Sequence, residues 1–197
     1  NEPVIQDERF RLGQDAAGAP TLHIEQRLAI PAVLDDLPRI GLLVKLAPDL
    51  DRLEYYGRGP EENHIDRQRG YPLARYHSTA AAEHVPYVVP QSSGNHTDVR
   101  WLMVTDARGQ GVRFAFDAPG EFSLSQYADD TLFRARHQHE LTPDEVLHLH
   151  VDHRQRGVGT GACGPDTLPR YRIRGGVHRF TLSLTPVGGG RTAAARQ

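Results

Sequence analysis

The chain has 197 residues, 38% of them hydrophobic and 24% charged, which is the composition of a globular domain with a substantial core. Its 23 basic and 25 acidic residues form no concentrated cationic run, which argues against a nucleic-acid-binding protein. With one cysteine it has no intrachain disulfide framework, and no apolar run approaches the roughly 20 residues of a membrane helix. We therefore expect a cytoplasmic protein without a membrane anchor. The chain begins with Asn1, not Met, so we also expect a processed product or a piece of a longer protein.

Alternation of apolar and polar residues, the period of β-strands, dominates the chain. The run over residues 39–46 is apolar enough to be buried on both faces, and Trp101 is expected to pack in the core. The stretch DARGQG separates two alternating runs and predicts a hairpin turn. In chain order, the pattern predicts at least seven strands, over residues 21–30, 39–46, 98–105, 112–118, 122–127, 145–153 and 178–187.

Helical patterns are rare in this sequence. One short helix is predicted over residues 130–139, with Leu132 and Phe133 turned toward the core. The 14 prolines and 19 glycines lie between the predicted strands as turn residues. Together these patterns predict an all-β fold, a large antiparallel β-sandwich with at most one or two short helices. The predicted single domain covers residues 1–187, and a disordered tail follows over 188–197.

The stretch HLHVDH near residue 150 has the spacing of a metal-binding motif. On a strand, His148, His150 and Asp152 share one face, while the apolar residues between them share the face toward the core. An HxHxDH string resembles the signature of the metallo-β-lactamase superfamily. That fold needs alternating strands and helices and further ligands downstream, where His178 is the only histidine after His153. We therefore expect a polar strand face turned toward solvent or a partner surface, and no metal.

Two other groups are weak candidates for metal binding or nucleophilic catalysis. His137 and His139 would diverge on the predicted helix, so we expect them near its C-terminal end and not as metal ligands. Cys163 lies in the Gly-rich stretch GVGTGACGPD without the strand–turn–helix context of an activated nucleophile. No helix follows this stretch to complete a phosphate-binding site. A structural loop is the simpler interpretation.

Carboxylate pairs for glycoside hydrolysis are also missing from the sequence pattern. The stretch GPEENHIDRQRG offers Glu61, Glu62 and Asp66, but adjacent residues cannot both face one substrate on an extended segment. An ion pair with Arg67 or Arg69 is expected here instead. The residues thus predict a β-sandwich without a catalytic site of its own.

Several strings occurring in one order, from about residue 21 to 187, resemble the C-terminal small-chain region (domain 5) of the β-galactosidases of glycoside hydrolase family 2. The strings are RIGLLVKLAPDLDRLEYYGRGPEENHIDR, VPYVVPQSSGNHTDVRW, RGVGTGACGPDTLPRYRI and HRFTLSLTPV. The chain departs from the family pattern at His64, Ser92 and His96, where Tyr, Glu and Arg are usual. The matching residues include Gly59, Pro60, Glu62, Asn63, Asp66 and Arg67 of a GPxENYxDR string, and Asp98, Arg100 and Trp101 of a second string.

The resemblance implies a fold and a role for the chain. It implies a supersandwich related to galactose mutarotase, the last domain of a multi-domain enzyme that hydrolyses terminal β-D-galactosides such as lactose. The two catalytic glutamates and most ligands of Mg²⁺ and Na⁺ would lie on a preceding (α/β)₈ barrel, so this chain is expected to bind no cofactor and no metal. Its expected partners are the barrel and other domains of the same enzyme, which is expected to be a homo-oligomer.

The resemblance also implies one contact with substrate. The family's Gly-rich loop brings a Trp to the edge of the sugar pocket, and the corresponding residues here are Gly161, Ala162, Cys163 and Gly164. Cys163 takes the aromatic position, which removes a stacking surface for a pyranose ring. The strand around His150 would aim this loop. Two alternatives stay open on the residues alone: a stand-alone carbohydrate-binding module and a mutarotase-type aldose epimerase.

Overall fold

The computed structural model describes residues 2–160 and 164–188. These residues form nine strands, one α-helix and two 3-10 helices. The helical segments are α1 (Asp129–Arg134), η1 (Gln138–Glu140) and η2 (Pro169–Tyr171). The strands are β1 (Ile5–Gln14), β2 (Pro20–Ile30), β3 (Arg39–Leu46), β4 (Arg52–Arg58), β5 (Leu73–Thr79), β6 (His96–Thr105), β7 (Gly111–Ser125), β8 (Leu147–Gln155) and β9 (Gly176–Val187).

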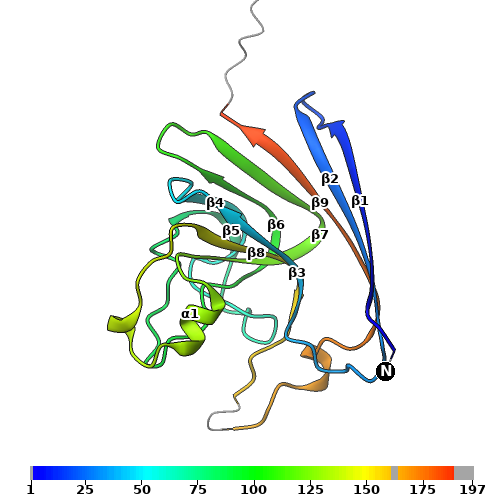
Figure 1. Cartoon of the computed structure of the whole chain (residues 1–197), viewed down its shortest axis with the longest axis vertical. Helices are drawn as coiled ribbons and strands as arrows, with labels where there is room; N and C mark the ends of the chain where they lie inside the picture. The colour runs from blue at the N-terminus through cyan, green and yellow to red at the C-terminus, as the bar shows by residue number, and fades with distance from the viewer. Residues whose placement is uncertain (1, 161–163, 189–197) are drawn as a thin grey trace, which may run out of the picture.

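All strands belong to one strongly curved antiparallel sheet (Figure 1). The main path runs β1-β2-β9-β7-β6-β4-β5, and β8 and β3 form a branch that starts from β7. The predicted hairpin is present, because Thr105 of β6 pairs with Gly111 of β7 across the DARGQG turn. The predicted all-β antiparallel fold with little helix is confirmed.

Strand β7 joins the two parts of the sheet. Strand β6 pairs along both halves of β7, β9 pairs with the first half, and β8 pairs with the second half, where Phe122 lies opposite Val151. Gly120 lies between the halves, at a point where a Cβ atom would come within 2.3 Å of the Phe116 ring. Only glycine fits there without displacing that ring. The two predicted strands over 112–118 and 122–127 are therefore the halves of one strand.

The core is continuous across both parts of the sheet. Strand β8 contributes Leu147, Leu149 and Val151, as its alternation predicted, and β7 contributes Phe122 and Leu124. Burying five such side chains stabilises the fold by about 1.5–3 kcal/mol each before conformational entropy is counted. These buried strands fix the points at which the polar loops begin and end.

Several sequence-based expectations differ from the structure. Strands β1, β4 and β5 were not predicted: β1 and β4 carry several charged residues, β5 is short, and β1 is exposed along its whole length. Strand β3 is not buried on both faces: Leu43 is 52% exposed, since β3 pairs only with β8 and forms an edge. The helix is shorter than predicted and ends at Arg134, with Leu132 buried but Phe133 87% exposed. None of the helices in the described part of the chain is both long and apolar enough to cross a bilayer.

Candidate functional site

The segment after β4 carries a buried carboxylate with a complete set of partners. Glu62 accepts hydrogen bonds from the Tyr87 hydroxyl at 2.5 Å and the Gly94 backbone N–H at 2.8 Å, and pairs with the Arg67 guanidinium at 2.9 Å. Burial opposes its ionisation, but hydrogen bonds from His64, Tyr87 and Gly94 outweigh burial and lower the pKa of Glu62 to about 2. The expected ion pair with Arg67 is confirmed. Glu62 thereby joins this segment to the loop before β6.

Asn63, next in the chain, is fully buried and fully hydrogen-bonded. Its amide nitrogen donates to the carbonyls of Arg58 and Glu61, at 3.0 and 3.1 Å. Its amide oxygen accepts from the backbone N–H of Thr97 at 3.0 Å and from the Thr97 hydroxyl at 2.5 Å. One side chain thus closes the turn after β4 and ties it to β6, which fixes the backbone that carries Asp66.

Asp66 holds the base of the Gly-rich loop. Its two carboxylate oxygens accept the backbone N–H groups of Val158 at 3.2 Å and Gly159 at 2.7 Å. A Cβ atom on Gly157 would lie 2.7 Å from the Asp66 carboxyl carbon, so glycine is needed for this approach. Gly159 has a φ of +63°, a left-handed conformation that glycine adopts without strain. The segment 59–67 and the start of the loop at 157–160, about 90 residues apart in sequence, therefore form one unit.

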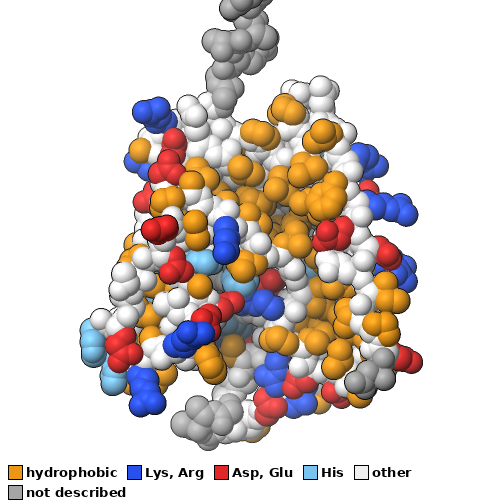
Figure 2. Space-filling view, in the orientation of Figure 1, with side chains coloured by type: hydrophobic (Ala, Val, Ile, Leu, Met, Phe, Trp, Pro, Cys, Tyr) orange, Lys and Arg blue, Asp and Glu red, His pale blue; other side chains and the backbone are white. Residues whose placement is uncertain are grey.

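The neck of the loop is closed by a second set of bonds. The Thr167 hydroxyl donates to the Gly157 carbonyl at 2.6 Å, and Arg156 pairs with Asp36 at 2.6 Å and with Asp166 at 2.9 Å. The Gly164 N–H donates to the Thr160 carbonyl at 2.6 Å. Figure 2 shows acidic and basic side chains gathered at this end of the molecule, beside the loop. Gly161, Ala162 and Cys163 lie outside the described residues, so the expected place of Cys163 stays a prediction.

A hollow of about 380 Å³ lies beside the loop. It has both charged and apolar walls, and the Arg170 guanidinium lies 4.7 Å from the centre of the Tyr171 ring. Charged donors and acceptors next to an aromatic ring are groups that a polar ring-shaped ligand such as a sugar can use. The lining residues are Asp66, Arg67, Gly159, Thr160, Pro165, Asp166, Leu168, Arg170 and Tyr171.

Comparison with known proteins identifies the family. The family model described as "Beta galactosidase small chain" matches residues 10–184. The chain belongs to the β-galactosidase small-chain family. It is 30% identical over 167 residues to a β-galactosidase of Actinobacillus pleuropneumoniae, covering 85% of this chain, and 33% identical over 165 residues to one of Priestia megaterium, covering 82%. It is 36% identical over 148 residues to β-galactosidase BgaC of Bifidobacterium adolescentis, covering 74% of this chain.

The small chain is a minor part of these relatives. It spans 16% of the length of the first two and 14% of the third. Its fold therefore accounts for one region of much longer proteins, all three of which are named as β-galactosidases.

Three residues at the end of the second family string, Asp98, Arg100 and Trp101, make other contacts. The Asp98 carboxylate pairs with Arg58 at 2.5 Å, and the Asp98 backbone carbonyl accepts a hydrogen bond from the Arg100 guanidinium. Asp98 lines a small cavity of about 120 Å³ next to Tyr171. Trp101 does not pack in the core as expected: it is half-buried, with the guanidinium groups of Arg75 and Arg113 at 5.7 and 5.2 Å from its ring. The ring of Trp101 thus lies between charged side chains of β5 and β7.

The polar face of β8 is buried, and the expectation that it faces solvent is wrong. His148 contacts Asp144 at 2.8 Å, and His150 contacts Asp129 at 3.1 Å. Both aspartates belong to the connection between β7 and β8, which includes α1 and folds back over this face (Figure 1). The sequence signal for this cover was weak, because a single buried leucine, Leu132, holds α1 down.

Asp152, at the end of the same face, is almost fully buried and poorly paired. Its nearest cation is the Arg39 guanidinium at 3.7 Å, and both its carboxylate oxygens lack a hydrogen bond from any described residue. Burial raises the pKa of Asp152 to about 7, with smaller contributions from the charges of Glu121 and Asp129, against the opposing effect of Arg39. Burial likewise raises the pKa of Glu121, its cross-strand neighbour. Sequence reasoning did not single out this acid pair.

Proposed function

We propose that this chain is a non-catalytic C-terminal domain of a retaining β-galactosidase of glycoside hydrolase family 2. The parent enzyme would hydrolyse terminal β-D-galactosides such as lactose, with its catalytic carboxylates, Mg²⁺ and Na⁺ on a barrel outside this chain. The domain would pack on that barrel in a homo-oligomeric enzyme and hold its Gly-rich loop at the edge of the sugar pocket. A cytoplasmic location fits the single cysteine.

One observation carries the proposed positioning role. The Asp66 carboxylate, within the segment that most resembles the family, accepts both backbone N–H groups at the base of the loop. Gly157 must be glycine for Asp66 to come so close. This arrangement serves to fix a loop, because each carboxylate oxygen of Asp66 accepts a backbone N–H group of that loop.

The carboxylates of the described residues support a non-catalytic role. Glu62 has a pKa of about 2 and is held by Arg67, so it cannot act as a proton donor near neutral pH. Glu121 and Asp152 have raised pKa values, but both are buried and lie opposite each other on neighbouring strands. A glycosidase pair needs two carboxyl groups on either side of a bound sugar.

Two measurements test this proposal. The purified 197-residue chain should show no hydrolysis of o-nitrophenyl β-D-galactoside. A chimera in which this chain replaces the matching region of the Priestia megaterium enzyme should hydrolyse that substrate. Turnover by the isolated chain would overturn the non-catalytic assignment. A chimera that folds and assembles yet is inactive would overturn the positioning role.

The hollow beside Tyr171 supports a carbohydrate-binding module as the second candidate. In that case the isolated chain should bind lactose, and bound lactose should protect the backbone amides around Tyr171 from hydrogen exchange. Saturable binding by the isolated chain without any activity of the chimera would favour this candidate. Accelerated exchange of galactose anomers in a polarimeter would favour the aldose epimerase instead.

A further inference from the structure

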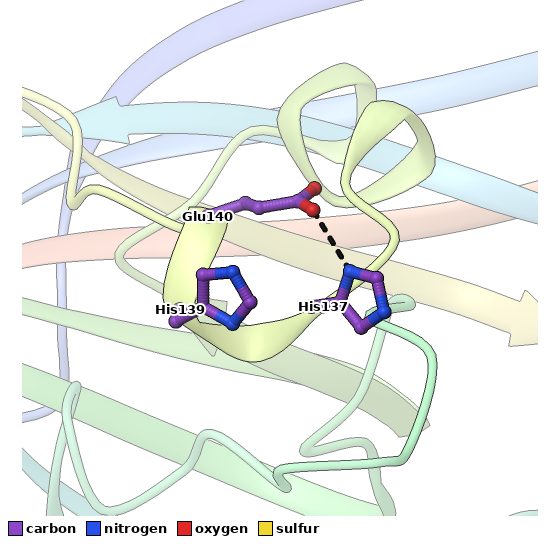
Figure 3. Close-up of side chains that lie close together, drawn as sticks. All are labelled: His137, His139 and Glu140. Carbon is purple, nitrogen blue, oxygen red and sulfur yellow. Dashed lines mark hydrogen bonds and ion pairs between the residues drawn. The ribbon is translucent and has the colours of Figure 1, made fainter.

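A tight turn follows α1 and brings two histidines together. The helix ends at Arg134 because Ala135 is extended, and His137 is extended as well, with φ −139° and ψ 150°. The chain then enters the 3-10 helix η1, so His137 and His139 lie on the same side of the turn (Figure 3). Their imidazole rings stack with centroids 5.4 Å apart and planes 16° from parallel.

Glu140 completes the cluster. One of its carboxylate oxygens lies 2.9 Å from Nδ1 of His137, as Figure 3 shows, and the other accepts the Arg136 backbone N–H at 2.8 Å. These two bonds lower the pKa of Glu140 to about 2, with the bond from His137 as the larger cause. One ligand atom from each of the three residues lies within 4.8 Å of the other two.

We propose that His137, His139 and Glu140 form a surface site for a borderline divalent transition metal, with Zn²⁺ as the representative ion. Two imidazole nitrogens and one carboxylate oxygen are ligands that Zn²⁺ binds, and three protein ligands leave a fourth position for water or another group. Hard cations such as Mg²⁺ prefer oxygen ligands and should bind far less well. Within the described ranges, this is the one cluster of three such side chains.

The geometry needs only a small adjustment to hold a metal. Tetrahedral zinc with bonds of about 2.1 Å separates its ligand atoms by about 3.4 Å, so separations of up to 4.8 Å would close by at most about 1.4 Å. All three side chains are exposed and free to rotate by this amount. Metal binding would replace the bond between His137 and Glu140 with bonds to the cation, so the charge of Glu140 stays compensated.

The backbone of the turn is held from the opposite side. The Gln138 amide, between the two histidines, donates to the Tyr87 carbonyl at 2.6 Å and lies 2.9 Å from Nε2 of His84. Gln138 therefore fixes η1 against the loop before β6 while its neighbours stay exposed. A turn held in advance loses less conformational entropy when a metal binds. The expectation that the histidines diverge assumed an α-helix through residue 139, and the helix ends five residues earlier.

Calorimetric titration of the untagged, EDTA-treated 197-residue chain with ZnCl₂ tests the site. We expect about one equivalent to bind, and no comparable heat from MgCl₂ at the same concentration. The double variant H137A/H139A should lose at least tenfold in affinity, because it removes two of three ligands. His77→Ala, which removes an exposed histidine of β5, is the matched control and should bind as the parent does. Failure of the parent to bind, or an unchanged affinity in the double variant, would overturn the proposal.

A spectroscopic measurement identifies the ligands. Zinc X-ray absorption should show two imidazole nitrogens and oxygen ligands, and no sulfur. Sulfur in the coordination shell would assign the metal to Cys163, the single cysteine, and would overturn the proposal. Glu140→Gln should weaken binding while the circular dichroism stays unchanged, since all three residues are exposed. An unchanged affinity in this variant would remove Glu140 from the site.

Discussion

At the scale of single residues, two aspartates have opposite roles. The Asp66 carboxylate accepts two backbone N–H groups, whereas Asp152 is buried with a raised pKa and an imperfect partner. The first stabilises a loop, and the second costs stability whenever it must ionise. Substitution at each position should therefore change stability in opposite directions at alkaline pH.

We predict that Asp66→Ala lowers the free energy of unfolding by about 1–3 kcal/mol, the range for losing hydrogen bonds to a charged acceptor. The amide protons of Val158 and Gly159 should lose protection from hydrogen exchange, because the carboxylate that holds them is gone. Asp49→Ala, on an exposed turn, serves as the control. Equal protection of these two amides in Asp66→Ala and the parent would contradict the anchoring role.

We predict that Asp152 makes the stability of the folded chain depend on pH. A pKa raised to about 7 in the folded state, against 3.8 as the ordinary value, means that the folded chain binds the extra proton between these pH values. Stability from this group is therefore fully present below pH 3.8 and is lost as the pH rises through 7. Asp152→Asn should remove that loss, which is at most on the order of 4 kcal/mol at 1.4 kcal/mol per pKa unit. Denaturant titrations from pH 4 to 8 should show that the free energy of unfolding of the variant increases relative to that of the parent as pH rises. Asp35→Asn, at an exposed position, is the control. A constant difference across this range would show that Asp152 ionises normally.

At the scale of elements, the β7–β8 connection depends on one side chain. Leu132 is buried and Phe133, its neighbour on α1, is 87% exposed. Leu132 thus holds α1 over the polar face of β8, where Asp129 meets His150. A six-residue helix has little stability of its own, so tertiary packing decides whether it forms.

We predict that Leu132→Ala lowers the free energy of unfolding by about 2–3 kcal/mol, as for other buried leucines, whereas Phe133→Ala changes it by less than about 0.5 kcal/mol. Urea unfolding of the two variants checks this difference. Equal effects of the two substitutions would mean that α1 does not pack as described.

At the scale of the whole molecule, the sequence predicts the fold class but not the way its parts cover one another. Alternation in β8 places Leu149 in the core correctly, because a strand's period is fixed by its backbone. Alternation cannot tell that the opposite face, with His150, is covered by a segment that starts about twenty residues earlier. The family string containing Asp66 is visible in the sequence, but its contact with Gly159 depends on tertiary structure alone. The turn that joins His137 and His139 was not predicted, because the helical pattern of the sequence continues through residue 139 although the helix ends at Arg134.

The core is continuous, so the whole sheet should unfold as one unit. Strand β7 pairs with β6 along both halves, with β9 in its first half and with β8 in its second, and the buried side chains of both parts form one cluster. Neither part can lose its strands without exposing apolar surface of the other, so we expect one cooperative unfolding transition. Fluorescence of Trp101 on β6, the single tryptophan, should report the same urea midpoint as far-ultraviolet circular dichroism, which reports on all strands. Separate midpoints would mean that the branch formed by β3 and β8 folds as an independent unit, and the Gly-rich loop that follows β8 would then be held less rigidly than the bonds to Asp66 indicate.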